Sequence, residues 1–448
     1  RDVEAQSDPN LTVAEDLSRR DLTINAMAWD MRKHELLDPF NGQADLNTGF
    51  IRCVGKPEAR FQEDYSRILR AMRFACRFDF QIEEQTWSAL TKIMTKINNI
   101  RDVKVVDVIR RKIALCKKPA EKEKLQAHLA EQTMSDPNQT MAEYIVPRET
   151  AAKELLKTLK ENPARALELW DESGALKAFL PETLKMKGCE QPAQFHSEGD
   201  VWKHTMMMLQ KINSKEFREY FKGAHITGEF VLGVLLHDAG KPPTKKTPEA
   251  DGTNRIRFDG HDQVSATIAG EVANRLSLSK EQKELLKFMT SEHMVPMSAK
   301  DMFQMSANKF ARRFIDSPYS TELLMLFYLD SVCSVRADGA DTLQNFRDTL
   351  KRIEEINQNR AKWSKEKRKK ITNGDTVIKT LQIKSGCFVG CVLELLAELA
   401  DSGRLASEEE AIRFLEMNKG AIVDFEKNAK PENRGEIAEK MIKQFDQN

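Results

Sequence analysis

The 448-residue chain carries 70 Lys and Arg against 69 Asp and Glu, so any binding of nucleic acid must depend on local basic patches. Hydrophobic residues make up 40% and charged residues 31%, which predicts a folded protein of two to four domains and excludes a disordered chain. No apolar run approaches the length of a membrane span, and the seven scattered cysteines, without a CxxC pair, fit a reducing cytoplasm.

The first predicted elements are short. Asp2–Gln6 could be the last strand of a larger unit, and Thr12–Glu15 has the pattern of a capping box that opens a helix. Ala26–Trp29 and Glu35–Leu37 predict the two strands of a hairpin, and Asp38–Gly42 predicts the turn that follows it.

A polar stretch separates that helix from the hairpin. Arg20 could bind a phosphate, while Asp21 and Asn25 could hold a ribose through hydrogen bonds. The same residues would also fit a structural role at the capped start of a strand. The stretch alone therefore leaves both interpretations open.

A helix with a stripe of arginines is predicted over residues 63–78. Arg67, Arg70, Arg73 and Arg77 recur at intervals that place them within about a third of the helix circumference. Apolar residues occupy most of the other positions, so the helix can bury one side. Such a stripe suits a triphosphate or a nucleic-acid backbone, because each planar guanidinium can grip phosphate oxygens at two points.

The acidic start of this predicted helix suggests base selection. Asp64 only accepts hydrogen bonds and Arg67 only donates them, so together they would form a rigid acceptor–donor edge. Cytosine and adenine both present an amino donor beside a ring-nitrogen acceptor, whereas uracil and guanine present a keto oxygen. The alternative is an ordinary ion pair within one helix, which stabilises a helix by a few tenths of a kcal/mol.

The rest of the chain is predicted to be helical. Few apolar residues occur around residues 115–140, where we expect an insertion. A new unit begins near residue 189, and its histidines form an ordered set with two aspartates. Within this set, the adjacent residues His237 and Asp238 end an apolar run. A buried charge at that point needs a partner, which a metal ion would supply. The candidate metal ligands are His204, His237, Asp238, His261, His293 and Asp330.

Three successive motifs resemble the class II CCA-adding enzyme and bacterial poly(A) polymerase family. They are residues 19–26 (RRDLTINA), 38–46 (DPFNGQADL) and 63–75 (EDYSRILRAMRFA), and residues 146–156 (VPRETAAKELL) resemble the later neck helix of that family. The resemblance implies that Asp64 and Arg67 select CTP and then ATP. It further implies nucleotide binding by Arg20, Arg70 and Arg73, with Asp21 and Asn25 contacting the sugar or holding the shape of the site.

The sequence also departs from the family pattern. Tyr65-Ser66 stands where the family has Pro-Leu between the selecting residues, and we expect a mild effect because the spacing is kept. The family's Gly-Gly-x-Val-Arg-Asp loop and its Asp-x-Asp metal pair are not present, and Asp2 and Glu4 cannot replace that pair. Since this transfer depends on two metal ions, we expect the chain to be a fragment that lacks its first segment and adds no nucleotide by itself.

The histidine set resembles the HD phosphohydrolase superfamily, and residues 199–205 (GDVWKHT) and 258–262 (FDGHD) strengthen this resemblance. It implies a first metal at His204, His237, Asp238 and Asp330, with His261 and His293 holding a second metal or positioning a phosphate. His237 and Asp238 would be catalytic. Imidazole and carboxylate ligands suit Mn, Ni, Co, Fe or Mg better than a structural zinc.

We therefore expect a mainly α protein with the remnant of an α/β nucleotidyltransferase palm. The expected domains are the end of the head (1–58), a helical neck (59–188), an HD domain (189–345) and a helical C-terminal region (346–448). The expected activities are CCA addition to tRNA from CTP and ATP with Mg²⁺, and phosphohydrolysis at the HD site. The alternatives are a poly(A) polymerase or A-adding enzyme, a stand-alone HD phosphohydrolase, and a non-catalytic RNA-binding protein.

Overall fold

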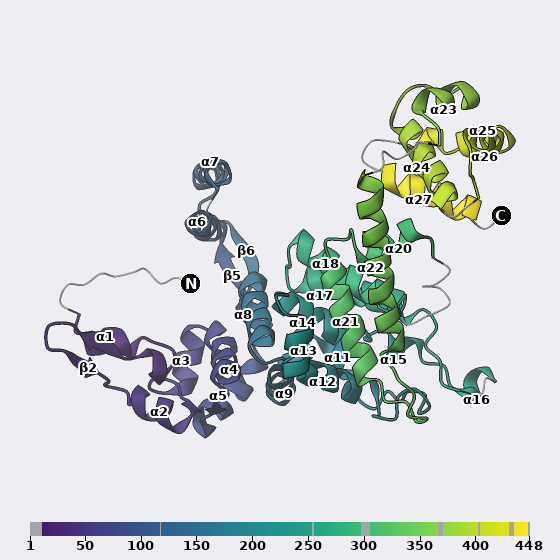
Figure 1. Ribbon diagram of the computed structural model, residues 1–448. Coiled ribbons are helices and arrows are strands. Elements are labelled where there is room, and N and C mark those ends of the chain that lie inside the picture. Colours follow the sequence, from purple (N-terminus) through teal and green to yellow (C-terminus); the bar gives the residue numbers. More distant parts are fainter. Residues whose placement is uncertain are drawn as a thin grey trace. The chain divides into compact units, whose positions relative to one another are not determined.

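A computed structural model describes residues 11–116, 118–252, 255–296, 305–365, 371–401, 404–429 and 434–446. The fold is mainly α, as expected (Figure 1). The chain forms two compact units, of which the first comprises Arg1–His293 and Val332–Ala340 and the second Met294–Ser331 and Asp341–Asn448. The four expected domains stay a prediction, and the strand expected at Asp2–Gln6 lies outside the described residues.

The first unit begins with a small α/β segment. Helix α1 (Val13–Ser18) starts at the predicted capping box, in which Thr12 and Glu15 bond to each other's backbone. The predicted hairpin is confirmed as strands β1 (Ala28–Asp30) and β2 (Glu35–Leu37), which pair antiparallel. The other elements of the segment are η1 (Thr23–Asn25), α2 (Gly42–Thr48) and β3 (Phe50–Ile51), which pairs in parallel with β4 (Gln81–Ile82).

The arginine-stripe segment forms two helices rather than one. Helix α3 (Pro57–Glu63) ends before Asp64, whose backbone is extended, and α4 (Ser66–Phe78) begins two residues later. The expectation that the acidic pair opens the helix is therefore wrong. Helix α4 packs against α3, α8 (Arg148–Glu161) and α9 (Pro163–Ser173), and α5 (Glu84–Met94) packs on α3.

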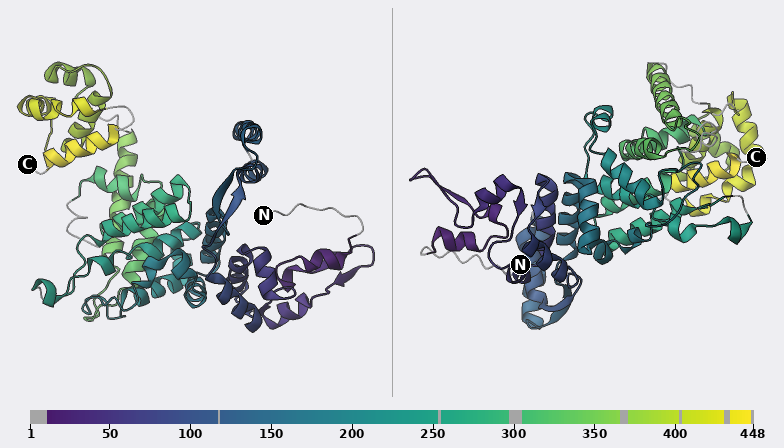
Figure 2. Two further views of the ribbon diagram at one scale, coloured as in Figure 1. Left: turned by 180° about the vertical axis from the view of Figure 1, so that it is seen from behind. Right: turned by 90° about the horizontal axis from the view of Figure 1, so that it is seen from below.

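The expected insertion forms an arm with strands that the sequence analysis did not predict. Strands β5 (Ile100–Lys104) and β6 (Thr140–Tyr144) pair antiparallel and carry α6 (Val105–Leu115) and α7 (Pro119–Ser135) at one end (Figures 1 and 2). Helix α7 contributes no buried residue, which agrees with its few apolar positions.

Helix α14 (Gly228–Leu236) is the centre of the helical part that follows. All but one of its residues are buried, and it packs against α8, α12, α17 and α18. A Cβ at Gly228 would lie 2.1 Å from the carbonyl oxygen of Leu156, so this glycine permits the close approach of α14 to α8. The helices of this part are α10 (Ala175–Phe179), α11 (Pro181–Leu184), α12 (Val201–Lys211), α13 (Lys215–Tyr220), α14, α15 (Lys241–Thr244), α16 (Pro248–Asp251), α17 (His261–Arg275) and α18 (Lys280–Glu292).

The second unit has a core of its own around α24 (Cys387–Asp401), which packs against α23 (Gly374–Leu381) and α27 (Arg434–Asp446). None of the described helices is both long and apolar enough to span a membrane. The other elements of this part are α20 (Ala307–Phe314), α21 (Ser320–Cys333), α22 (Gln344–Lys365), α25 (Glu408–Met417), α26 (Lys419–Val423) and η2 (Glu426–Asn428).

Candidate metal centre and nucleotide-binding residues

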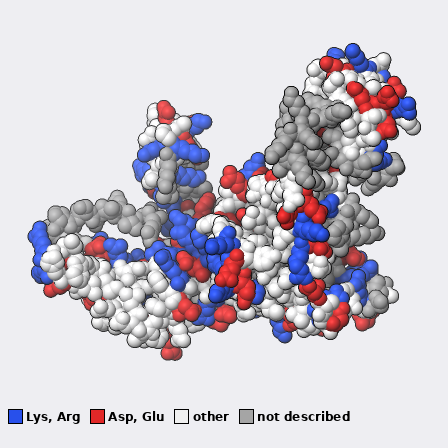
Figure 3. Space-filling model, viewed as in Figure 1, with Lys and Arg blue, Asp and Glu red and all other residues white. Residues whose placement is uncertain are grey.

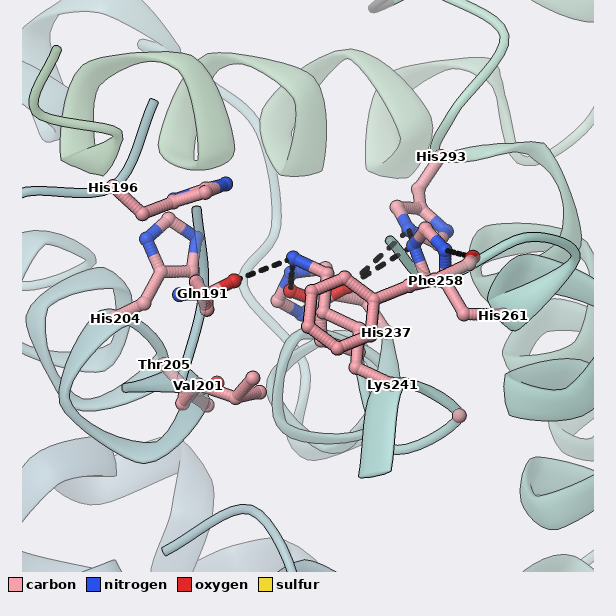
Figure 4. A network of polar contacts seen from close by, with 12 residues as sticks. Gln191, His196, Val201, His204, Thr205, His237, Lys241, Phe258, His261 and His293 are labelled. Atoms are coloured by element: carbon pink, nitrogen blue, oxygen red, sulfur yellow. Dashed lines mark hydrogen bonds and ion pairs between the residues drawn. The ribbon is translucent and has the colours of Figure 1, made fainter. Parts of the chain in front are cut away.

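Four of the predicted metal-binding histidines are buried in the first unit at or near helix ends. His237 and His293 are the C-cap residues of α14 and α18. His261 is the first residue of α17, and His204 lies in the second turn of α12. The order of these residues along the chain predicted a common site, and the fold brings His237, His261 and His293 together around Asp238, with the ring of His204 next to that of His237. In Figure 4, His196 and His204 lie on one side, His261 and His293 on the other, with His237 and Lys241 between them.

Three of these imidazoles are oriented by the backbone. The Nδ1 atoms of His237, His261 and His293 lie 2.7, 2.8 and 2.7 Å from the carbonyl oxygens three residues earlier. At the C-terminal ends of α14 and α18 such carbonyls have no partner within the helix, so they are available as acceptors. In a neutral imidazole, donation by Nδ1–H leaves Nε2 deprotonated, which is the form that ligates a metal.

The three Nε2 atoms converge on one carboxylate. Oδ2 of Asp238 lies 3.2 Å from Nε2 of His237, and Oδ1 lies 3.3 and 3.6 Å from the Nε2 atoms of His261 and His293. The two latter nitrogens are 3.2 Å apart. Nε2 of His237 is buried and makes no hydrogen bond. Asp238, His261 and His293 form a group that could hold a metal ion.

The charge of Asp238 is compensated in this buried site. Burial opposes ionisation, but His237 and Lys241 outweigh it and hold the pKa of the Asp238 carboxyl well below its usual range. Nζ of Lys241 lies 2.7 Å from Asp238 Oδ2 and donates at 2.7 Å to Oε1 of Gln191. Burial lowers the pKa of His293, which favours its neutral, ligating form.

These residues fit a divalent metal. The metal donors would be imidazole nitrogens and a carboxylate. The Nδ1 atoms of the imidazoles already have hydrogen-bond partners, whereas the buried Nε2 of His237 has none. Nitrogen and oxygen donors without a thiolate suit Mn, Fe, Ni, Co or Mg. Asp330, the last predicted ligand, is buried on α21 and belongs to the second unit.

His204 is oriented differently, by a residue that the sequence analysis did not single out. Its Nδ1 lies 2.8 Å from Oε1 of Glu198, and Nδ1 of His196 lies 2.8 Å from the same oxygen. The backbone N–H of Val335 donates to the other oxygen at 2.9 Å. Glu198 lies six residues before His204, outside any helical spacing, so no sequence pattern points to this contact.

Gly240 allows the loop that carries Asp238 to lie against the start of α17. A Cβ at Gly240 would lie 2.2 Å from the backbone oxygen of His261 and 2.7 Å from the backbone nitrogen of Ser265. The N–H of Gly240 donates to Oγ of Ser265 at 2.8 Å. Only a residue without a side chain can bring the loop that carries Asp238 this close to α17.

In the head segment, Asp21, Asn25 and Arg70 come together as the sequence analysis expected of one site. Nε of Arg70 donates to Oδ2 of Asp21 at 2.5 Å, and Nδ2 of Asn25 donates to Oδ1 at 3.4 Å. Burial opposes ionisation of Asp21, but the bond to Arg70 outweighs it and lowers the pKa of this carboxyl.

Two other predicted nucleotide-binding residues are not part of this cluster of Asp21, Asn25 and Arg70. The exposed side chain of Arg20, just after α1, pairs with Asp16 of that helix at 3.2 Å. Arg73 is buried, and its Nε donates at 2.6 Å to Glu154 of α8. Arg73 thus joins two helices of the neck, and its role in nucleotide binding stays a prediction.

Asp64 and Arg67 both have partners close to the break between α3 and α4. Arg67 forms an ion pair with Glu63 at 2.8 Å and donates to the carbonyl oxygens of Arg60 and Arg19. Ser66 donates to Oδ1 of Asp64 from its hydroxyl at 2.5 Å and from its backbone N–H at 3.0 Å. The departure from the family motif at Ser66 therefore adds a contact that orients Asp64.

Comparisons with known proteins find matches to two regions of the chain. Residues 1–52 match the Poly A polymerase head domain, and residues 202–332 match the HD domain. The Multifunctional CCA protein of Neisseria meningitidis is 32% identical over 289 residues, which is 64% of this chain and 54% of that protein. That of Nitrosomonas europaea is 29% identical over 290 residues, 65% of this chain and 55% of that protein. The chain spans about half the length of these curated relatives.

The CCA-adding enzyme of Bacillus stearothermophilus in complex with CTP aligns with 93% of this chain and 76% of its own, at 18% identity and a TM-score of 0.47. The chain therefore contains a region similar to a Poly A polymerase head domain and one similar to an HD domain, and it resembles Multifunctional CCA proteins over 64% of its length.

Proposed function

We propose that this chain is part of a tRNA nucleotidyltransferase that adds CCA to tRNA 3′ ends from CTP and ATP, and that it also hydrolyses phosphoesters at its HD site. The observation that carries the first activity is the 32% identity to a Multifunctional CCA protein over 64% of the chain, which combines a head-domain match with an HD match. The expected location in the cytoplasm stays a prediction.

The head residues would divide the recognition of the nucleotide. Asp64 would accept from the amino group of cytosine or adenine, and Arg67 would donate to the ring nitrogen. Asp21 fixes the guanidinium of Arg70, which leaves its other donors for a phosphate or the sugar. The tRNA acceptor stem would be recognised by shape and backbone along basic helices, and Mg²⁺ would serve the transfer.

Base selection is tested with Asp64→Ala. In a form of the protein that adds nucleotides, the variant should lose its preference for CTP and ATP over UTP and GTP, because the acceptor for the amino group is gone. The matched control is Asp79→Ala on the loop after α4. Unchanged selectivity in Asp64→Ala would refute the assignment.

At the HD site, His204, His237, Asp238, His261, His293 and Asp330 would hold the divalent metal. A bound metal there supplies a Lewis acid that activates water and polarises the phosphoryl group. The chain's own residues hold the imidazoles in the ligating tautomer, and the ammonium of Lys241 offers a donor for a phosphate oxygen. A phosphomonoester or a 2′,3′-cyclic phosphate would suit this arrangement.

Hydrolysis is tested with the full chain after removal and return of metal. Mn²⁺, Ni²⁺, Co²⁺, Fe²⁺ and Mg²⁺ would be compared on 2′,3′-cyclic AMP and a phosphomonoester. We expect activity with at least one metal, its loss in Asp238→Ala, and its retention in the surface variant Asp259→Asn. Hydrolysis that survives both chelation and Asp238→Ala would refute the proposed site.

The rivals predict other outcomes. Addition of ATP alone to varied RNA 3′ ends would favour a poly(A) polymerase or A-adding enzyme. Metal-dependent hydrolysis without nucleotide transfer in any form would favour a stand-alone HD phosphohydrolase. Turnover at either site would exclude a non-catalytic RNA-binding protein.

A further inference from the structure

We propose that Glu198 is a positioning residue of the HD site, which fixes His204 in the tautomer that presents Nε2 to the metal, and that His196 in turn holds Glu198. This inference rests on the proposed metal site. Glu198 itself need not touch the metal or the substrate.

The position of His204 in its helix explains why it needs such a partner. The other three imidazoles donate to carbonyls at the end of or outside a helix. His204 lies inside α12, where the carbonyl three residues earlier, of Val201, accepts from the hydroxyl of Thr205 at 2.9 Å. An acceptor for Nδ1 of His204 must therefore come from outside the helix.

The geometry of α12 directs the ring toward the acceptor. Side chains in a helix lean toward its N-terminus, and the loop that carries Glu198 lies just before α12. His204 is fully buried, and the side chain of Glu198 is 2% exposed. A buried imidazole and a buried carboxylate at 2.8 Å form a charge-assisted hydrogen bond shielded from water.

Glu198 is held from three directions. His196 and His204 donate to Oε1, and the N–H of Val335 donates to Oε2. These three donors engage both oxygens of the Glu198 carboxylate. The Ser197 N–H and hydroxyl both donate to the carbonyl of Val335, at 2.8 and 3.0 Å, which fixes the loop.

A carboxylate behind His204 should have two effects on a metal. It holds Nδ1 protonated, so that Nε2 carries the lone pair, and it makes the imidazole a stronger donor than a carbonyl partner would. Loss of such an outer partner typically weakens metal affinity by about 10–100-fold. His196 contributes by holding the carboxylate in place.

The test measures metal binding and the tautomer of His204 in the full chain. Calorimetry with Co²⁺ gives affinity and stoichiometry for the wild type, Glu198→Ala, Glu198→Gln and His196→Ala. Glu190→Gln, an exposed glutamate eight residues earlier, is the control. Nitrogen-15 spectra of labelled histidine report which ring nitrogen of His204 carries the proton in the metal-free chain.

We expect Glu198→Ala to bind Co²⁺ about 10–100-fold more weakly with unchanged stoichiometry and to lose the single Nδ1–H tautomer. Glu198→Gln should lose less affinity, because its amide oxygen still accepts, and Glu190→Gln should match the wild type. Thermal unfolding of the metal-free variants shows whether each one folds. If Glu198→Ala does not fold, the isosteric Glu198→Gln takes its place in the comparison. Its Co²⁺ affinity should still be lower than that of Glu190→Gln.

The outcomes separate the inference from the proposed function. No Co²⁺ binding by the wild type would refute the metal site itself. Wild-type affinity and tautomer in folded Glu198→Ala and Glu198→Gln would refute the role of Glu198 while leaving the metal site intact. Loss of one whole metal equivalent in His196→Ala would mean that His196, Glu198 and His204 ligate a metal directly, which would also overturn the positioning role.

Discussion

Asp21 and Asp238 are buried carboxylates that remain ionised through cationic partners. Asp21 bonds to Arg70 in the head segment, and Asp238 lies 2.7 Å from the ammonium of Lys241 at the candidate metal centre. Both pKa values are lowered, although burial alone would raise them. At the scale of single residues, a nearby positive charge keeps a buried carboxylate ionised in both sites.

The pH dependence of stability should reveal the Asp21–Arg70 pair. Because the pKa of Asp21 in the folded chain lies below its ordinary 3.8, its contribution to the free energy of unfolding is present above that value. The contribution is lost as the pH falls through the lowered pKa. Urea unfolding should show Asp21→Asn less stable than the wild type at pH 7, with a gap that narrows in acid.

Asp102→Asn, an exposed position on β5, is the control for this experiment and should show no such gap. A difference between Asp21→Asn and the wild type that stays constant from pH 7 into acid would contradict the pairing.

The sequence predicted which residues come together at the candidate metal centre but not how their side chains are oriented. His237-Asp238 and the ordered histidines were visible because their residue types point directly to metal chemistry. Glu198 was missed because its role depends on a loop that folds back on the start of α12. Likewise, the ion pair of Arg67 with Glu63 depends on the break between α3 and α4, which the arginine spacing did not reveal.

At the scale of elements, the sites depend on segments that lie very close together and on buried ion pairs between helices. The helix α14 was predictable from its unbroken apolar run, and the arginine stripe predicted α4. Strands β5 and β6 were missed because nearly all of their side chains are exposed, so no alternation of apolar residues marks them. Their pairing depends on a contact between segments 40 residues apart, Lys104 with Thr140 at the near end and Ile100 with Tyr144 at the far end.

Gly240→Ala should damage the metal centre. The added Cβ would collide with the backbone oxygen of His261, so the loop and α17 must separate. We expect a loss of about 1–3 kcal/mol in the free energy of unfolding and weaker Co²⁺ binding in calorimetry. Gly420→Ala in α26, where no atom lies near the added Cβ, is the control and should leave both unchanged or slightly raise stability. Wild-type metal affinity in Gly240→Ala would contradict this account of the site.

The buried pair of Arg73 and Glu154 should join α4 to α8. Glu154→Leu leaves a buried guanidinium without its partner and should cost about 3–5 kcal/mol in the free energy of unfolding. The double variant Arg73→Met with Glu154→Leu should recover much of this loss. Glu161→Ala at the exposed end of α8 is the control. Equal losses in the single and double variants would argue against a buried ion pair.

At the scale of the whole molecule, the charge is nearly balanced, and Figure 3 shows Lys and Arg mixed with Asp and Glu on the visible face. In the arm, Arg111 and Arg110 already pair with Glu143 and Asp107, at 3.0 and 2.9 Å. Recognition of RNA by this chain would therefore rest on local groups of basic residues rather than on a uniform positive field.

The two proposed activities should be separable. Asp238→Ala should abolish phosphohydrolysis but leave nucleotide addition unchanged, because Asp238 belongs to the metal centre and the nucleotide residues lie on α1, α4 and the segments beside them. Both activities would be measured on one preparation, with Asp259→Asn as the control. Loss of both in a folded Asp238→Ala would show that the sites are coupled.

The central claim is tested by adding nucleotides to a tRNA that ends at its discriminator base. Each of the four labelled nucleotides is supplied with Mg²⁺ to this chain and to a form with an Asp-x-Asp segment ahead of Arg1, from its own gene or from the Neisseria meningitidis relative. The account predicts sequential addition of C, C and A by the form that carries the Asp-x-Asp segment, with no incorporation of U or G. No addition by any form, or addition of A alone to varied RNA ends, would contradict it.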